Sequence, residues 1–514
     1  MKTGSGFSKN TIALAAICLA ALMFGLEISS VPVILPTLEK VLHGNFRDMQ
    51  WIMNAYTIAC TTVLMAIGAL ADRYGRKRVF VISLVLFGIT SLICGLAQRV
   101  GILVIGRLLQ GAGGGAMLIC QIAILSHQFR DGRERSRAFS IWGVVFGIGL
   151  GFGPIIGGLI VAVSSWQWVF LVHVVITIVT LLLVSGSIRE SADPHAEKVD
   201  IIGIITLSAT VLGLSYYITQ GPEIGFSSAA GIGVITLAAL SFIIFLIAEK
   251  RVKHPMFDFS VFRISRFSGA LLGSMGMNFS FWPFMIYLPI YFQSGLGYDA
   301  VTAGMALLAY TLPTLVFPPV GERLAMRYNP GVVIPWGMLA IGIGFLLMKT
   351  GSAAARPGWQ TMLPGLLIAG AGLGIINTPV TNTTTGAVSS DRAGMASGID
   401  MSARMIALAV NIALMGFILI EGILYYLKRA LPDTHGPLHQ LAEKIASGSV
   451  NTAGNEFPEL AAADPSGKVV HDALVHGFGL VMLYGGTGII VLAVISFVVF
   501  RQEKKAAQVM EQAV

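Results

Sequence analysis

Charged residues are scarce in this chain. Asp, Glu, Lys and Arg together make up 12% of its 514 residues, whereas hydrophobic residues make up 55%. Soluble domains usually carry about 25% charged residues, so this composition excludes an ordinary water-soluble protein. We therefore expect an all-α membrane protein whose helices are embedded in a lipid bilayer.

Cysteine is also rare, and its placement argues against a disulfide framework. The four cysteines lie in apolar segments of the first quarter of the chain, which is typical of small packing residues: Cys18, Cys60, Cys94 and Cys120. The sequence also lacks the G-x-x-x-x-G-K-[ST] loop that binds nucleotide phosphates. We expect no use of ATP, no cofactor besides the proton as coupling ion, and no enzymatic activity.

Long apolar runs dominate what is present. A membrane-spanning helix needs ~20 largely apolar residues, and the sequence contains fourteen such runs. The first run is too long for a signal peptide, so it should remain as the first membrane helix. The predicted spans are 11–37, 50–72, 79–98, 102–126, 138–163, 167–187, 200–220, 229–249, 267–293, 300–321, 331–349, 361–384, 396–427 and 475–500.

The basic residues indicate the orientation of these spans. If the N-terminus is cytoplasmic, most Lys and Arg fall in loops on the cytoplasmic side, such as the run Arg76, Lys77 and Arg78. An excess of this kind is typical of cytoplasmic loops. We expect both termini in the cytoplasm and a location in the bacterial inner membrane. The net charge of +8 then reflects topology and gives no reason to expect a nucleic-acid partner.

A faint internal repeat indicates the domain plan. "LADRY" (70–74) closes the second predicted span, and "LAMRY" (324–328) closes the tenth. Two parallel six-helix repeats are the build of one transporter class. The domains expected are an N-terminal six-helix bundle (1–190), two linker helices (191–260) and a C-terminal six-helix bundle (261–514) with an outer loop at 428–473. Histidines occur in and just after that loop, but a solvated loop is favoured over a metal site because cysteines and clustered carboxylates are missing.

The most specific motif is "GALADRYGRKRV" (68–79), at the cytoplasmic end of the second span. Asp72 lies at the membrane edge, where it can accept from a basic side chain, Gly75 permits a tight turn, and Arg76 can anchor in the interface. The pattern G-x-L-x-D-x-x-G-R-K resembles the signature loop of the major facilitator superfamily. With fourteen spans, the chain is similar to its drug:proton antiporter branch. The resemblance implies that Asp72, Gly75 and Arg76 form a cytoplasmic gate.

The fourth span contains "GRLLQGAGGGAM" (106–117), which places Arg107 and Gln110 on nearly the same helix face. An arginine inside the membrane is costly and needs an acceptor, unless it reaches the outer interface by snorkelling. The segment resembles the R-x-x-Q-G motif of the same family. That resemblance implies a role for Arg107 in proton coupling.

The fifth span contains a dense glycine motif within "GIGLGFGPIIGGLI" (147–160). Glycines four residues apart let two helices approach closely, and a proline bends its helix. The residues of the motif are Gly149, Gly153, Pro154, Gly157 and Gly158. The pattern resembles the antiporter motif of exporters in this family, which implies efflux rather than uptake.

Glu27 is the one charged residue in the apolar run from Thr11 to Leu38. An ionisable residue at that depth is expensive and therefore indicates a function. Its place nine positions before Pro36 resembles the family's first-span pattern, although the family usually has Asp there. We expect Glu27 to be the main protonation site, because burial and a titrating carboxyl together allow proton exchange as a cavity alternates sides.

Polar residues of the second half give further candidates. Asp400 and Arg404 are spaced i, i+4 and can pair on one helix face; the resemblance implies proton or cation handling for Asp400, and a structural ion pair is an equal alternative. The candidates for a substrate cavity are Gln110, Asn278, Trp282, Asn377 and Arg404. Contacts between helices explain the polar residues of this set equally well, and lipid-facing packing explains Trp282.

His173 stands where the family's sixth-span pattern has Asn. We favour a satisfied core histidine there over a titrating group.

The function expected from the resemblance is proton-driven export of small amphipathic compounds by a monomer, with an adaptor protein as an optional partner. A specific exporter or importer of a metabolite, siderophore or lipid is one alternative. A membrane sensor or scaffold without transport is another, although it gives no reason for Glu27, Asp72 and Arg107.

Overall fold

The computed structural model describes most of the chain and is built from helices. The described residues are 9–129, 132–191, 200–251, 259–354, 356–388, 393–432, 438–447, 464 and 467–512, and no β-strand occurs among them. The helices up to residue 251 are α1 (Lys9–Leu42), α2 (Phe46–Tyr74), α3 (Arg76–Gly95), α4 (Val100–Gln128), α5 (Gly132–Val163), α6 (Gln167–Ser187), α7 (Ile201–Ile224) and α8 (Ala229–Arg251).

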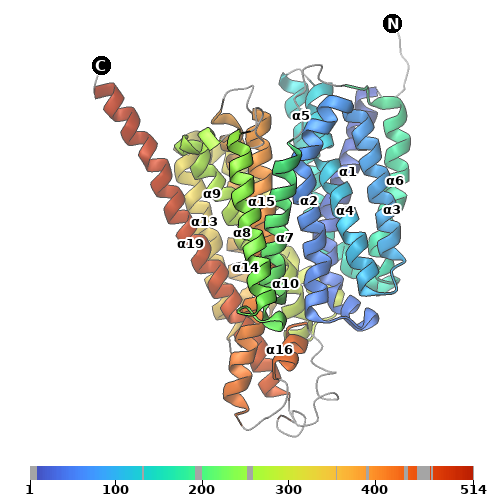
Figure 1. The fold of residues 1–514 in the computed structure, drawn as a ribbon, viewed down its shortest axis with the longest axis vertical. Helices are drawn as coiled ribbons and strands as arrows, with labels where there is room; N and C mark the ends of the chain where they lie inside the picture. Colours follow the sequence, from blue (N-terminus) through green and yellow to red (C-terminus); the bar gives the residue numbers. More distant parts are fainter. Residues whose placement is uncertain are drawn as a thin grey trace.

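The rest of the described chain is also helical. Its elements are η1 (Phe259–Arg263), α9 (Ser265–Phe279), α10 (Phe281–Ile290), the π-helix η2 (Tyr291–Gly295), α11 (Ala300–Val316), α12 (Pro318–Tyr328), α13 (Pro330–Ser352), α14 (Trp359–Gly386), α15 (Ala393–Ala430), α16 (Leu438–Ser447) and α19 (Lys468–Gln512). The start of α1 and the end of α19 lie at one end of the molecule, and α16 lies at the other (Figure 1).

Many of these helices are long and apolar enough to cross a bilayer. Eleven helices of the described residues meet that test, and α11 with α12, which are bent by 44°, give a twelfth if they form one span. The other two predicted spans, 50–72 and 267–293, coincide with α2 and with the broken run of α9 and α10. The chain is therefore a multi-pass membrane protein, and the number fourteen stays a prediction.

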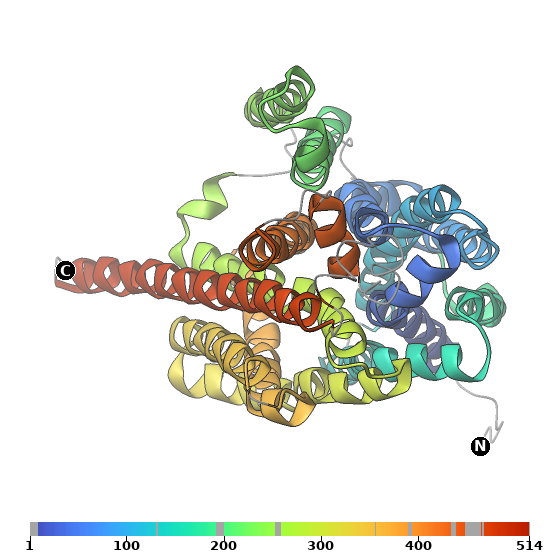
Figure 2. The ribbon, with the colours of Figure 1, turned by 90° about the horizontal axis from the view of Figure 1, so that it is seen from below.

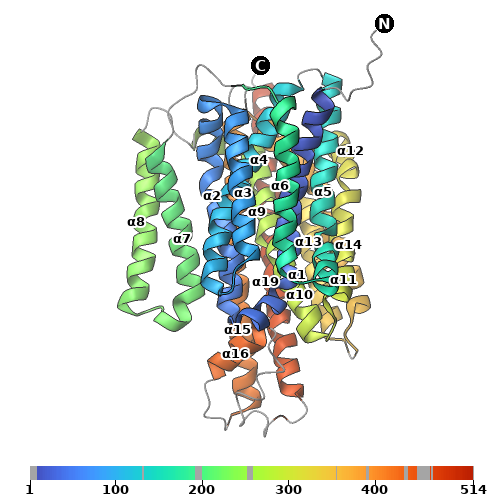
Figure 3. The ribbon, with the colours of Figure 1, turned by 90° about the vertical axis from the view of Figure 1, so that its right-hand side faces the viewer.

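Two groups of helices pack side by side. Helices α1 to α6 contact one another, chiefly α1 with α5 and α6, and α4 with α2 and α3. The second group is formed by α9 to α15 and α19, in which α13 packs on α14 and α19. Helices α7 and α8 pack together at the edge, where α7 contacts α2 and α15 (Figures 2 and 3).

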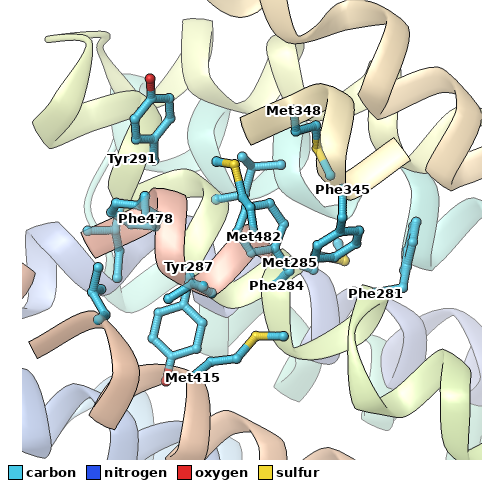
Figure 4. Packing of buried hydrophobic residues seen from close by; sticks show 14 of the residues in the cluster. Phe281, Phe284, Met285, Tyr287, Tyr291, Phe345, Met348, Met415, Phe478 and Met482 are labelled. Carbon is cyan, nitrogen blue, oxygen red and sulfur yellow. The ribbon is translucent and has the colours of Figure 1, made fainter. Parts of the chain in front are cut away.

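The core of the second group is rich in aromatic and methionine side chains (Figure 4). Phe281 stacks on Tyr310 with ring centroids 3.9 Å apart, and Phe284 packs at 4.9 Å from Phe345. Aromatic pairs of this kind add about 0.5–1.5 kcal/mol beyond the area that they bury. This packing holds α10 in place, although the helix is interrupted at Ser280, between α9 and α10.

The repeat seen in the sequence has a structural counterpart. "LADRY" is followed by Gly75 with φ of +110°, and "LAMRY" is followed by Asn329 with φ of +77°. The backbone N–H of Gly75 donates to the Ala71 carbonyl, and that of Asn329 donates to the Ala325 carbonyl; both bonds are 3.0 Å long and reach back four residues. The two segments therefore end their helices with turns of the same kind.

The prediction of a solvated outer loop was wrong for one segment. The described helices narrow the loop from both ends, since α15 continues to Ala430 and α19 begins at Lys468. The short helix expected around 438–446 is confirmed as α16, but its apolar side is buried: Leu441, Ala442, Ile445 and Ala446. The reason is amphipathicity, because this apolar face gains stability by packing against the helix ends beside it.

Candidate functional site

Glu27 lies at the centre of a buried polar cluster in the first group of helices. Its side chain on α1 has no exposed surface, and it accepts hydrogen bonds from Arg107 and Gln110 of α4. The bond from Gln110 Nε2 to the carboxylate is 3.1 Å long. Because a buried carboxylate needs charge-assisted partners, α4 supplies both the counter-charge and the second donor.

Arg107 is fully buried, which excludes the alternative that it snorkels to the outer interface. Its Nε donates to the backbone carbonyl of Ile52 at 3.1 Å, and its guanidinium lies 4.3 Å from the centre of the Tyr56 ring. Removing one member of a buried ion pair typically costs about 3–5 kcal/mol because the other charge is left uncompensated. The predicted residues Glu27 and Arg107 are thus brought together by the fold.

Gln110 belongs to the same cluster. It accepts from Arg107 at 2.8 Å and donates to the Ser91 hydroxyl at 2.9 Å, so it links α4 to α3. Its side chain is buried. The structure therefore places Gln110 as a hydrogen-bond partner of Glu27 and Arg107. It has no exposed surface, whereas a residue that lines an open cavity would have some.

His173 of α6 was expected to be a core residue, and the structure gives it a further contact. It is buried, as expected, but its Nε2 lies 3.0 Å from the Glu27 carboxylate. The only signal in the sequence was its replacement of the Asn in the family pattern. That signal does not reveal which helix the imidazole faces.

A second polar cluster lies in the other group of helices. Asp400 accepts from Ser274 of α9 and pairs with Arg404 at 2.9 Å. Arg404 also donates to Asn377 at 3.2 Å and to Thr381 at 2.9 Å, both on α14. The expected i, i+4 pair is present in the structure. The side chain of Asp400 is 4% exposed and that of Arg404 is 11% exposed, whereas Asn377 is exposed, so the cluster has a dry end and an accessible end.

The remaining cavity candidates are Asn278 and Trp282. Asn278 is buried and donates to the backbone carbonyl of Ser274, which is a contact within α9. Trp282 of α10 is partly buried and packs against apolar clusters that include residues of both helix groups, such as Leu35 and Leu408. Of the two, Trp282 is the one that packs where the two helix groups meet.

The motif predicted to form a gate ends α2 with a turn at Gly75. Asp72 lies in the last turns of α2, and the description does not extend to its side chain. The backbone N–H of Arg76 donates to the Ser191 carbonyl at 2.9 Å. A methyl group added at Gly75 would lie 2.7 Å from the Glu190 carboxyl carbon, and the positive φ also favours glycine there.

Glu190 was missed in the sequence. Its carboxylate accepts from the backbone N–H groups of Lys77 and Arg78 at 3.0 and 3.1 Å, so it caps the N-terminus of α3. Anions are stabilised at helix N-termini, where the first N–H groups lack partners within the helix. Glu190 follows α6 and lies more than a hundred positions away, so no local pattern marks it.

The glycine motif of α5 faces two helices at once. Methyl groups added at Gly149 and Gly157 would each lie 2.9 Å from a carbonyl oxygen of α1, and Gly153 also faces α1 at Ser29. Gly158 faces α11, where a methyl group would lie 2.5 Å from the Ala300 carbonyl. The α11 residue Gly304 packs in turn against the Pro154 carbonyl. The motif thus brings α5 close both to α1 in its own group and to α11 in the other.

Comparisons with known proteins agree with this arrangement. A model of the Major Facilitator Superfamily matches residues 17–412. The chain is 30% identical over 440 residues to multidrug resistance protein Stp of Mycobacterium tuberculosis (strain CDC 1551 / Oshkosh), covering 84% of this chain and 81% of that protein. It is 29% identical over 491 residues to the tetracenomycin C resistance and export protein of Streptomyces glaucescens, covering 94% and 90%.

The fold also resembles a solved transporter. The crystal structure of D-xylose-proton symporter matches with a TM-score of 0.59 and 16% identity, covering 80% of this chain and 90% of that one. At this identity the likeness concerns the fold alone. Taken with the family match over most of its length, it identifies the chain as a membrane transporter of the major facilitator superfamily.

Proposed function

We propose that this transporter exports small amphipathic, drug-like compounds in exchange for protons. The observation that carries the proposal is the fully buried pair of Glu27 and Arg107 between two membrane helices. A buried ion pair is weak evidence for stability, since apolar residues fill such a site at lower cost, so a coupling function gives a reason for its presence. The names of Stp and of the tetracenomycin C export protein support the export of drug-like compounds.

The coupling site in this proposal is the buried cluster around Glu27, where the exchanged proton binds. When the cluster opens to one side of the membrane, it takes up a proton; when it opens to the other side, it releases the proton. Exchange of this kind requires a group that is stable in both charge states as the surroundings change. Arg107 stabilises the ionised form of the site, and the pair of Asp400 and Arg404 is a second charged site in the same exchange.

The motion that accompanies this exchange is a rocking of the two bundles, 1–190 and 261–514, about a site near the membrane midplane. In this scheme α5 and α11 form the seam between the bundles. Asp72, Gly75 and Arg76 form the gate on the cytoplasmic side of the bacterial inner membrane, where both termini lie. The transporter acts as a monomer in this scheme, and an adaptor protein is not needed for the exchange itself.

The test combines transport with a matched carboxylate control. Purified protein in liposomes is given an imposed pH gradient, and a panel of fluorescent cations, beginning with ethidium, reports accumulation. The wild type should drive accumulation that collapses when the gradient is dissipated. Glu27→Gln should abolish it, and Glu421→Gln, a carboxylate on α15 with an exposed side chain, should not.

Two results would count against the proposal. Undiminished proton-driven accumulation by Glu27→Gln would remove Glu27 from the coupling site. The lack of any compound-induced proton movement by the wild type over a broad panel of dyes, detergents and antibiotics would favour a sensor or scaffold.

A further inference from the structure

The fold places the imidazole ring of His173 against the Glu27 carboxylate. It comes from α6, has no exposed surface, and lies with Nε2 3.0 Å from Glu27 Oε2. The ring is held edge-on to Phe87, with centroids 5.6 Å apart and an interplanar angle of 79°. The Glu27 carboxylate already accepts hydrogen bonds from Arg107 and Gln110. Packing alone therefore does not explain why His173 also lies against it.

The two nitrogens of His173 have different surroundings. Nε2 faces an anionic oxygen, so the neutral imidazole is more stable with its proton on Nε2, from which it can donate. Nδ1 is then a bare acceptor. Within the described residues neither ring nitrogen makes a well-formed hydrogen bond, but Nε2 has the carboxylate 3.0 Å away and Nδ1 has no charged neighbour at such a distance. A buried nitrogen without a partner is costly and calls for an explanation. Its lone pair is an open position for one proton.

The charges around the imidazole determine where an added proton is most stable. Glu27 faces it from α1, and Arg107 of α4 pairs with the same carboxylate; Tyr56 of α2 and Cys94 of α3 border that pair. With His173 neutral, the carboxylate and the guanidinium balance. One added proton gives the cluster a charge of +1 whether it binds to Glu27 or to His173.

The two positions differ in what they leave behind. A proton on Glu27 removes the counter-charge of Arg107, which is buried on all sides, and an uncompensated buried charge typically costs several kcal/mol. A proton on His173 leaves Glu27 ionised between two cations, each within hydrogen-bond distance. Opposite charges within about 4–6 Å favour the charged form of each group.

We propose that the coupling proton binds to Nδ1 of His173, while Glu27 stays ionised and paired with Arg107. This inference rests on the proposed function and refines it, since Glu27 then acts as the counter-ion that holds an imidazolium. The step is a simple protonation: a proton from water binds the Nδ1 lone pair when the cluster opens to one side, and it returns to water from the same atom when the cluster opens to the other. Glu27 remains necessary because it supplies the negative charge.

The direct test is the protonation state of the ring. Protein labelled with ¹⁵N-histidine is reconstituted in nanodiscs, and the ring nitrogens are followed by NMR as the pH is lowered. The signal lost in His173→Asn identifies the residue. We expect this signal to change from a neutral ring to an imidazolium in the wild type, and we expect the imidazolium signal to be lost in Glu27→Gln, because the anion that stabilises the cation is gone.

The same samples can also show the result that would overturn the inference. A His173 ring that stays neutral at every pH at which the protein remains folded, together with protonation of Glu27 followed by its ¹³C-carboxyl signal, would overturn the inference. His439→Asn is the matched control. That histidine lies near another carboxylate, Glu443, but on the short helix α16, so its loss should leave the His173 signal unchanged.

Transport gives a separate readout. His173→Asn should flatten the pH profile of ethidium accumulation while Glu27 and Arg107 still hold the helices together, and a profile equal to that of the wild type would contradict the inference. If the wild type moves no test compound, the proposed function fails at that point. The NMR titration still decides whether the proton binds His173, so the two failures can be distinguished.

Discussion

Arg47 at the start of α2 donates a hydrogen bond to Glu443 of α16, and 396 positions separate the two residues. The side chain of Arg47 is 6% exposed and that of Glu443 is 12% exposed. Nearby, the Ser447 hydroxyl donates to Glu39 at the end of α1. These contacts attach α16, which follows α15, to the first two described helices of the chain. They close the molecule at the end opposite the termini.

Glu443→Ala should therefore destabilise the protein by about 1–3 kcal/mol, since Arg47 loses a charged partner in a nearly dry site. Thermal unfolding in detergent measures the loss. A double-mutant cycle with Arg47→Ala should give a coupling energy above about 0.5 kcal/mol. Gln440→Ala, at an exposed position of the same helix, is the control. Strict additivity of the two substitutions would show that the pair contributes nothing.

The seam between α5 and α11 gives a second prediction. Gly158→Val places side-chain atoms against the Ala300 carbonyl, where even a methyl group would lie only 2.5 Å away. We expect the variant to reach the membrane and to transport at least tenfold more slowly, because α11 is pushed off α5. Gly143→Ala on the same helix meets nothing within 4 Å and should transport normally. Equal rates for both variants, measured as ethidium accumulation, would refute a tight seam at this end.

The pair of Asp400 and Arg404 allows a test that separates charge from structure. Asp400→Asn leaves Arg404 without its anion in a mostly buried site and should lower the unfolding temperature in detergent. Adding Arg404→Gln removes the unpaired charge and should restore most of the stability. If transport returns with stability, the pair is structural. Transport that stays absent in the stable double variant assigns the pair to coupling or to substrate binding.

The turn at Gly75 gives a prediction with an internal control. Gly75→Ala forces a Cβ into a backbone with φ of +110° and against Glu190, so we expect a cost of about 1–3 kcal/mol and impaired transport. Asn329→Gly, in the matching turn, places glycine at φ of +77° but loses the hydrogen bond that the Asn329 side chain accepts from the Gly331 N–H, so stability should change by only a few tenths of a kcal/mol. Equal falls in the unfolding temperatures of the two variants would contradict this account.

The sequence was sufficient to single out Glu27 and Arg107 as candidate functional residues, since a charge inside a long apolar run is costly and usually has a function. It was not sufficient to show that they meet. Eighty positions separate them, and their contact depends on which helices are neighbours and on how each is rotated about its axis. The i, i+4 pair of Asp400 and Arg404 was predictable because both residues lie on one helix.

Other features depended on tertiary structure that no local pattern encodes. The amphipathic pattern of α16 predicted a helix but gave no sign of its partner, Arg47. In the sequence Glu190 looks like any other loop residue after a hydrophobic helix. It can cap α3 because the packing of α6 on α3 brings the ends of the two helices side by side. The position of His173 against Glu27 belongs to the same class, because it requires the packing of α6 on α1.

The matching turns at Gly75 and Asn329 have different chemistry around the same backbone shape. Three basic residues follow Gly75, whereas Pro330, Gly331 and Val332 follow Asn329. If the two segments arose by duplication, the second copy has kept the backbone turn but lacks the basic residues that follow it in the first. The two halves are in this respect unequal, and a change in ionic strength should act on the three basic residues after the first turn without a counterpart after the second.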